Sequence, residues 1–312
     1  MGKRIFLTGL TASGKGSVAH EIALRTGGEV VAADSMKIYR EMDIGTAKPP
    51  AERRAQVPHH LMDFMDPAED FSTGEYVPLA LKAIEGIEAR GRQVIICGGT
   101  ALYLNALLEG IFHGPRADWA LRSALEARAE AEGLGALHGS LAARDPAAAR
   151  KIHPNDGRRI IRALEVLELT GRPMTELWKG PSLRLEPGSF ILAGIGWERE
   201  DLYRRIDTRV ARMVQAGLFE EARALRQRPG GLGRAALQCI GYKEIFLGED
   251  LGQGREEIVA RIQQRTRNFA KQQSTWFRRF PVLWIGAKGD LQPAAAADQI
   301  IEMARDAADR RG

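Results

Sequence analysis

A glycine-rich loop near the N-terminus constrains the fold of this chain more than any other feature. Residues 9–16 read Gly-Leu-Thr-Ala-Ser-Gly-Lys-Gly, the apolar run 5–8 precedes them, and residues 17–25 carry apolar side chains at helical spacing. A strand, a glycine-rich turn and a helix in this order are typical of a loop that surrounds phosphates with backbone N–H groups, a helix N-terminus and a lysine. We therefore expect the chain to bind phosphates through residues 11–16. The candidate residues are Gly9, Thr11, Ala12, Ser13, Gly14, Lys15 and Gly16.

One position departs from this motif. The pattern places Ser or Thr after the lysine, and that hydroxyl normally ligates Mg²⁺ between the phosphates. Here the position is Gly16, and the first hydroxyl follows at Ser17. Any Mg²⁺ would therefore be held by the phosphates, water and other residues. The loop alone leaves open a kinase, an ATPase, a GTPase or a transferase of diphosphorylated substrates, and a plain turn into a helix is the simplest alternative.

The remaining chain alternates strand-like and helical segments. Strands are expected at 29–33, 93–97, 190–195 and 282–285, and helices at 75–89, 101–108 and 202–225. This rhythm predicts an α/β fold with a parallel sheet. Residues 116–178 lack a convincing strand and contain helical patterns at 118–131, where Asp118 begins the helix, and at 157–170, where Asp156 is a candidate cap. We expect a core in two parts, 1–114 and 188–312, around an inserted helical domain, 115–187.

Composition narrows the class of protein. The chain has 312 residues, of which 44% are hydrophobic and 27% charged, and a net charge of +5 permits an anionic partner without demanding one. Its two cysteines form no disulfide framework, which fits a reducing compartment. The first apolar run is too short for a signal peptide, and no apolar stretch approaches the roughly 20 residues of a membrane span. We expect a cytoplasmic monomer with no membrane association.

Polar residues follow three of the expected strands. They are the loop itself, Asp34-Ser35 and Gly99-Thr100. Because ligands of parallel sheets bind at the carboxyl ends of strands, these groups are expected to meet in one crevice. Asp34 would there be a general base, a Mg²⁺ ligand or a turn aspartate, and spacing alone does not choose among these. The segment 34–49 has little periodicity, so we interpret it as a surface loop.

Two basic clusters indicate an anionic macromolecule. Residues 258–289 contain no acidic residue, and Trp276 and Phe277 lie among their cations. A basic helix with aromatics suits an RNA backbone and splayed bases, whereas the alternative is a solvated helix with the aromatics in the core. The cations are Arg261, Arg265, Arg267, Lys271, Arg278, Arg279 and Lys288, and the second cluster is Arg158, Arg159 and Arg162.

Taken together, these motifs resemble the tRNA dimethylallyltransferases along nearly the full length of the chain. The resemblance lies in the number and order of the matches. They are Gly9-Leu-Thr-Ala-Ser-Gly-Lys15, Asp34-Ser-Met, Asp43-Ile-Gly-Thr-Ala-Lys-Pro49, Pro58-His-His-Leu61, Gly98-Gly-Thr100, Ile152-His-Pro-Asn-Asp156, Arg162-Ala-Leu-Glu-Val166, Ile240-Gly-Tyr-Lys243 and Thr275-Trp-Phe-Arg278.

The resemblance implies an activity and a set of roles. The family transfers a dimethylallyl group from dimethylallyl diphosphate to N6 of the adenosine 3′ of the anticodon, uses Mg²⁺, and has a nucleotide-kinase-like P-loop core with a helical insertion that binds the anticodon stem-loop. By resemblance Asp34 is the base, Lys15 and Thr100 act at the reacting groups, and Arg209 binds the diphosphate. The implied tRNA contacts are Asp34, Ser35, Met36, Lys37, Thr100, Arg122, Arg158, Arg159, Arg162, Gln238, Gly241, Lys243, Lys271, Trp276 and Arg278.

Three positions depart from the family pattern. Gly16 replaces Thr, Lys37 replaces Gln, and Gln272 replaces a frequent Arg. Gly16 bears on metal geometry and Lys37 on recognition of the target base. The rival hypotheses are an adenylate isopentenyltransferase, a P-loop small-molecule kinase and a non-catalytic RNA-binding protein.

Overall fold

The computed structural model describes residues 3–111, 114–178 and 184–309. They form two compact units, which are described separately below. The sheet unit comprises Met1–Leu108 and Leu185–Gly312, and the helical unit comprises Glu109–Arg184. The insertion expected at 115–187 thus corresponds to a unit that begins and ends slightly earlier in the chain.

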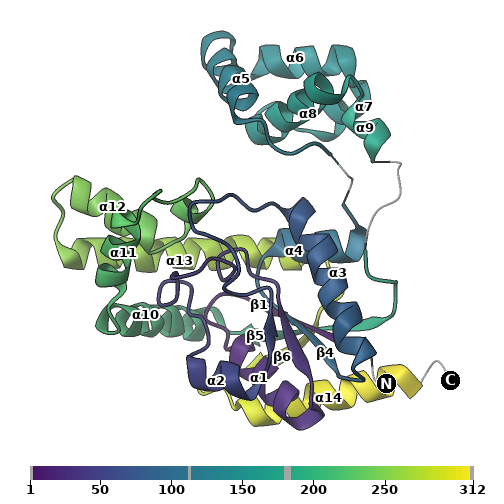
Figure 1. Cartoon of the computed structure of the whole chain (residues 1–312), viewed down its shortest axis with the longest axis vertical. Helices are drawn as coiled ribbons and strands as arrows, with labels where there is room; N and C mark the ends of the chain where they lie inside the picture. The colour runs from purple at the N-terminus through teal and green to yellow at the C-terminus, as the bar shows by residue number, and fades with distance from the viewer. Residues whose placement is uncertain (1–2, 112–113, 179–183, 310–312) are drawn as a thin grey trace. The chain divides into compact units, whose positions relative to one another are not determined.

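A parallel sheet of six strands organises the sheet unit (Figure 1). Its order is β3-β2-β4-β1-β5-β6, so the strand that precedes the glycine-rich loop lies inside the sheet. Leu7 pairs with Cys97 on one side and with Ala193 on the other. The strands are β1 (Arg4–Gly9), β2 (Glu29–Ala32), β3 (His59–His60), β4 (Val94–Cys97), β5 (Phe190–Trp197) and β6 (Leu283–Ala287).

Helices pack on this sheet through apolar side chains. Ile22 of one helix and Ile300 of another bury against Ile5 and Leu7, because alternate residues of a strand face the same side. The helices of the unit are α1 (Lys15–Thr26), α2 (Ala51–Gln56), α3 (Thr73–Ala89), α4 (Ala101–Glu109), α10 (Arg199–Gln215), α11 (Leu218–Gln227), α12 (Tyr242–Asp250), α13 (Arg255–Phe277) and α14 (Pro293–Asp309), with a 3₁₀ turn η1 (Ala236–Gln238).

The segment 34–49 is not the surface loop that its irregular pattern predicted. Ile38, Tyr39 and Met42 are at most 1% exposed and belong to a second apolar core with Phe219 and Tyr242. The prediction was wrong because a buried irregular segment has no repeat along the chain that would mark its apolar residues as core. The segment is therefore held in place by α11 and α12.

The helix expected over 202–225 is also two helices. Helix α10 ends at Gln215 and α11 begins at Leu218, with Gly217 at a φ of 101° between them. This left-handed conformation suits glycine and stops the helix. The other predicted strands and helices are present, with ends that differ by a few residues.

The elements named below make up the helical unit within its described residues, and all of them are helices. They are α5 (Trp119–Glu132), α6 (Leu134–Arg144), α7 (Pro146–Lys151), α8 (Gly157–Thr170) and α9 (Met174–Leu177). Asp118 accepts a hydrogen bond from Leu121 N at 2.9 Å, and the predicted cap Asp156 accepts one from Arg159 N at 3.2 Å. Leu137, Leu141 and Ile160 form part of the core. Neither this unit nor the described part of the sheet unit has a helix long and apolar enough to cross a membrane.

Candidate active site

A cavity of about 1220 Å³ lies in the sheet unit at the carboxyl ends of β1, β2 and β4. The glycine-rich loop, Asp34 and Thr100 all line it, so the three strand ends meet as predicted. Gly9 and Ser13 are not among its lining residues, and the side chain of Ser13 is fully buried. The sequence-predicted residues that line the cavity are Thr11, Ala12, Gly14, Lys15, Gly16, Asp34, Ser35, Met36, Lys37, Thr100, Arg209, Gln238 and Gly241.

The loop is closely packed around two of its three glycines. A Cβ on Gly9 would lie 2.8 Å from Ser13 Oγ, and one on Gly14, whose φ is 89°, would lie 2.4 Å from Leu291 Cδ2. A Cβ on Gly16 would meet nothing within 4 Å. Gly9 and Gly14 are therefore required by the curvature of the loop, whereas Gly16 is not.

Only part of the loop has N–H groups free for a ligand. Thr11 N donates to Gln273 Oε1 at 2.8 Å, and Ser13 N donates to Leu10 O at 3.1 Å. The expectation that all of residues 11–16 offer N–H groups is therefore corrected. Within residues 11–16, the N–H groups of Ala12, Gly14, Lys15 and Gly16 have no acceptor among the described residues, and they surround the start of α1.

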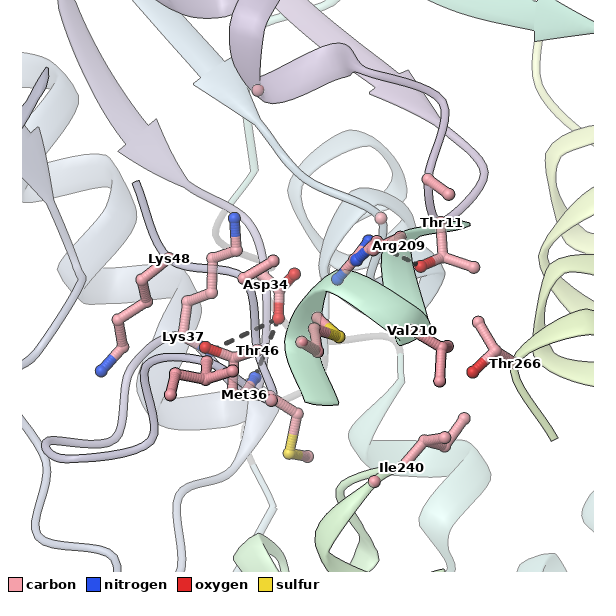
Figure 2. A pocket seen from close by; sticks show the side chains of 18 of the residues that line it. Thr11, Asp34, Met36, Lys37, Thr46, Lys48, Arg209, Val210, Ile240 and Thr266 are labelled. Carbon is pink, nitrogen blue, oxygen red and sulfur yellow. Dashed lines mark hydrogen bonds between the residues drawn. The ribbon is translucent and has the colours of Figure 1, made fainter. Parts of the chain in front are cut away.

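Several half-buried cations line the cavity, and three of them interact with Asp34. Burial lowers the pKa of Lys15 to about 8, although the nearby Asp34 carboxylate opposes this shift. Burial also lowers the pKa of Lys37 and of Arg209, again against the attraction of Asp34. Figure 2 shows Asp34, Lys37 and Arg209 gathered in this cavity, with Arg209 Nη1 donating to Thr11 Oγ1 at 3.2 Å. Cations that burial destabilises are well suited to an anionic ligand.

Only one carboxylate oxygen of Asp34 takes part in the local turn. Its Oδ1 accepts from Met36 N at 3.0 Å and from Lys37 N at 3.4 Å, so the turn interpretation of this residue is correct as far as it goes. Its Oδ2 has no hydrogen-bond partner in the described part of the chain. Thr100 Oγ1 accepts from Ser35 N at 3.0 Å, which holds the next residue in place. A carboxylate oxygen is thus left available inside the cavity.

Three residues in or next to the cavity make contacts there that the sequence analysis did not predict. Arg205 donates from Nε to Ala12 O at 3.0 Å and stacks 4.2 Å above the Trp197 ring. Gln273 bonds to both Thr11 and Gly99. Glu221 lies outside the cavity lining, and it accepts hydrogen bonds from the N–H groups of 43–45, which line the cavity, and from Tyr242 Oη. No local motif marks these residues, because their partners are remote in sequence.

The donors for a metal ion are few. Within the described ranges no group of three or more His, Cys, Asp or Glu side chains is placed to hold one. Ser17, the first hydroxyl after the lysine, accepts from Arg53 Nη1 at 3.2 Å. The loop therefore offers no side-chain oxygen in the position where the motif has one.

The predicted RNA-facing residues fall into two groups. In the sheet unit Lys271 and Arg278 are exposed and have no ion pair with a described residue. Phe277 is buried, whereas Trp276 is half-buried with Arg279 stacked 4.7 Å above its ring. Lys243 Nζ donates to Gln238 Oε1 at 2.8 Å. The core interpretation is therefore correct for Phe277 and not for Trp276.

Several predicted basic residues already have carboxylate partners. Arg122 and Arg162 both bind Glu165, and Arg159 lies 3.3 Å from Asp156. In α13, Arg267 pairs with Asp207 at 2.6 Å and Arg261 with Glu257 at 3.4 Å. Arg158 is exposed. The acid-free window of the sequence is thus less basic in space, because acids from elsewhere neutralise it.

Comparison with known proteins identifies the family. Residues 37–280 match the family model described as IPP transferase. The chain is 46% identical over 286 residues to the tRNA dimethylallyltransferase of Geobacter metallireducens, covering 91% of this chain and 93% of the relative. It is 45% identical over 296 residues to that of Geobacillus kaustophilus, covering 94% and 93%.

Solved structures agree. The full-length tRNA isopentenylpyrophosphate transferase of Bacillus halodurans matches with a TM-score of 0.70 and 38% identity, over 100% of this chain and 99% of that one. A eukaryotic dimethylallyltransferase acting on tRNA matches with a TM-score of 0.82 and 27% identity, over 100% and 81%. The predicted P-loop α/β fold and the predicted family are both confirmed: this chain belongs to the IPP transferase family, the tRNA dimethylallyltransferases.

Proposed function

We propose that the protein transfers a dimethylallyl group from dimethylallyl diphosphate to N6 of the adenosine 3′ of the anticodon in tRNA. The observation that carries this proposal is Asp34 Oδ2, which has no hydrogen-bond partner in the described ranges and lies in the same cavity as the phosphate-binding loop. A proton acceptor and an anion site in one cavity suit a reaction that removes a proton and releases a diphosphate.

The adenine amino group is a weak nucleophile because its lone pair is delocalised into the ring. In the proposed step the N6–C bond forms as the bond between that carbon and the diphosphate oxygen breaks. The N6 proton passes to Asp34 Oδ2, and the bonding electrons leave with the diphosphate. The turn bonds to Oδ1 hold the carboxylate so that Oδ2 meets the amino group.

The leaving diphosphate gains negative charge, which the loop is suited to stabilise. The free N–H groups of Ala12, Gly14, Lys15 and Gly16 are the donors, and Lys15 and Arg209 are the cations. Lys37 adds a third cation in the same cavity. Because no group of three or more metal-binding side chains is found among the described residues, we propose that Mg²⁺ arrives with the diphosphate, held mostly by phosphate oxygens and water.

An adenine in an anticodon loop must leave its stack to reach this cavity. We propose that the exposed Lys271 and Arg278, with the half-buried Trp276, bind the RNA from the sheet unit. Among the predicted RNA contacts of the helical unit, we propose that Arg158 binds a phosphate, since Arg122 and Arg162 are engaged by Glu165 and Arg159 by Asp156.

The test supplies labelled dimethylallyl diphosphate and Mg²⁺ with one of three acceptors: unmodified tRNA, the same tRNA with guanosine at the target position, or AMP. We expect label in the first tRNA alone, recovered as the N6-substituted nucleoside after digestion. Label in AMP but not in tRNA would establish the adenylate isopentenyltransferase instead. Binding of tRNA without transfer to either acceptor would indicate a non-catalytic RNA-binding protein.

A further inference from the structure

Helix α13 has a buried amide side chain next to the active-site cavity. Gln273 is 4% exposed, whereas Gln272, its neighbour in sequence, is exposed. Lys271 and Arg278 on the same helix are also exposed. Gln273 thus lies close to Lys271 and Trp276, which the family resemblance assigns to RNA, yet it points into the protein. A buried amide needs partners for both its oxygen and its nitrogen.

Both partners of Gln273 are backbone groups of the active site. Its Oε1 accepts from Thr11 N at 2.8 Å, and its Nε2 donates to Gly99 O at 2.8 Å. Only this orientation of the amide satisfies both, because Thr11 N is a donor and Gly99 O an acceptor. One side chain therefore joins the segments that follow β1 and β4.

Each of these segments carries a group of the proposed reaction. Thr11 Oγ1 accepts from Arg209 Nη1 at 3.2 Å. Thr100 follows Gly99, and its hydroxyl accepts from Ser35 N beside Asp34. A Cβ on Gly99 would lie 2.7 Å from Gln273 Nε2 and 3.3 Å from Lys15 Nζ, so the amide and the loop lysine both lie close to Gly99. A shift of Gly99 would move Thr100 and the surroundings of Lys15 together.

We propose that Gln273 is a positioning residue, which holds the phosphate-binding loop and the Gly99–Thr100 segment in register for group transfer and does not contact the RNA. The change in kcat that we expect from this inference rests on the proposed function. The effect on the anion site does not depend on the acceptor, because the two hydrogen bonds shape that site directly.

The first test compares Gln273→Met with Gln272→Met. Methionine keeps the length of the side chain and removes both hydrogen bonds, and the exposed neighbour is the matched control. Misplacement of reacting groups by about 1 Å costs on the order of 100-fold in rate. We therefore expect Gln273→Met to lose about 30- to 100-fold in kcat, with the Kd for tRNA and the KM for tRNA unchanged. Turnover by Gln273→Met equal to that of Gln272→Met would overturn the proposal, and so would a parallel loss of tRNA affinity.

The second test uses Gln273→Glu and does not depend on the apolar variant being well folded. A protonated carboxyl has the same pattern as the amide, since its O–H donates to Gly99 O and its other oxygen accepts from Thr11 N. An ionised carboxylate would instead face a carbonyl oxygen. We expect the kcat of Gln273→Glu, divided by that of the wild type at each pH, to rise as pH falls from 8 to 5.5. A ratio that does not change with pH would contradict the hydrogen-bonding role.

A binding measurement separates this inference from the proposed reaction. Inorganic diphosphate is titrated calorimetrically into wild type, Gln273→Met and Gln272→Met without RNA. We expect weaker binding in Gln273→Met alone, by about tenfold. If wild type fails to transfer label to tRNA but this difference is found, the proposed function fails and the positioning role stands. Equal affinity in all three proteins overturns the positioning role, whatever the reaction.

Discussion

Asp34 in the sheet unit keeps one carboxylate oxygen without a partner among the described residues, whereas Glu165 in the helical unit has both oxygens engaged. Glu165 is completely buried, and it accepts from Asp118 N at 2.7 Å and from Arg122 Nε and Nη2 at 2.9 Å each. Arg162 Nη1 also donates to it. Asp34 uses Oδ1 for its turn and leaves Oδ2 facing the cavity residues.

The cations of the two units differ in the same way. Arg122 and Arg162 meet a buried carboxylate, so their charge contributes to the fold of the helical unit. Lys15 and Arg209 line a cavity, and burial lowers the pKa of each. Charge that the protein itself neutralises supports structure, and charge left without full compensation is suited to a ligand. The comparison predicts that mutations will affect activity in one unit and stability in the other.

Asp34→Asn should have the largest effect. The amide oxygen still accepts from Met36 N, so the turn is kept, but the side chain no longer takes a proton. Loss of a general base lowers the rate by about 10²- to 10⁴-fold. Single-turnover transfer should fall by this factor while the melting temperature stays within about 2 °C. Asp201→Asn, at another carboxylate lining the cavity, is the control, and an equal loss there would show a general charge effect.

Glu165→Gln should act on stability. It removes the charge that compensates two arginines, and breaking such a buried pair costs about 3 kcal/mol of unfolding free energy. Glu132→Gln, in the exposed pair with Arg128, should cost less than about 0.5 kcal/mol. Denaturant unfolding measures both. Similar losses in the two variants would remove the contrast between buried and exposed charge.

The contribution of Glu165 should also depend on pH in a defined direction. Burial raises its pKa, but hydrogen bonds from Arg122, Arg162 and Asp118 outweigh burial, and the net pKa is lowered. The folded state then binds its proton less readily than the unfolded state. The stabilisation is therefore complete above the unfolded pKa of about 4.3 and is lost as pH falls through the folded value. The wild type should lose more stability than Glu165→Gln on acidification below that pH.

Lys15 provides a pH test of the sheet unit with a smaller effect. Its pKa of about 8 means that the free protein loses this charge as pH rises through 8. Affinity for inorganic diphosphate should fall about tenfold between pH 7 and 9, with no matching fall in Lys15→Met. The unfolded chain binds more protons at this lysine between pH 8 and about 10.4, so stability should not fall with affinity. If stability fell in parallel, the decline in affinity for diphosphate would be due to unfolding.

Gly16→Thr should have the smallest effect. The added Cβ meets no atom within 4 Å. At a helical position, replacing glycine also lowers the conformational entropy of the unfolded chain, which favours the folded state. We expect transfer at or above the wild-type rate, within about threefold, and stability higher by up to about 1 kcal/mol. Gly14→Ala is the contrasting variant, because its Cβ would clash with Leu291 at a φ of 89°. A large loss of activity in Gly16→Thr would mean that a ligand comes close to this backbone.

Much of the fold was predictable because its signals are local. The glycine-rich loop, the apolar runs of β1, β4 and β5, and the caps Asp118 and Asp156 each depend on residues a few positions apart. The carboxyl ends of parallel strands meet at one edge of a sheet, so the meeting of Asp34 and Thr100 with the loop also followed.

The sequence by itself thus determined the phosphate-binding loop, the α/β order and the strand ends where chemistry is placed. Only the tertiary structure decided which charges are neutralised and which N–H groups are free. Thr11 N donates to Gln273, 262 residues away, so it is not free for a ligand. Arg122 pairs with Glu165, 43 residues away. Such pairings depend on how distant segments pack, and the spacing of residues along the chain does not reveal that packing.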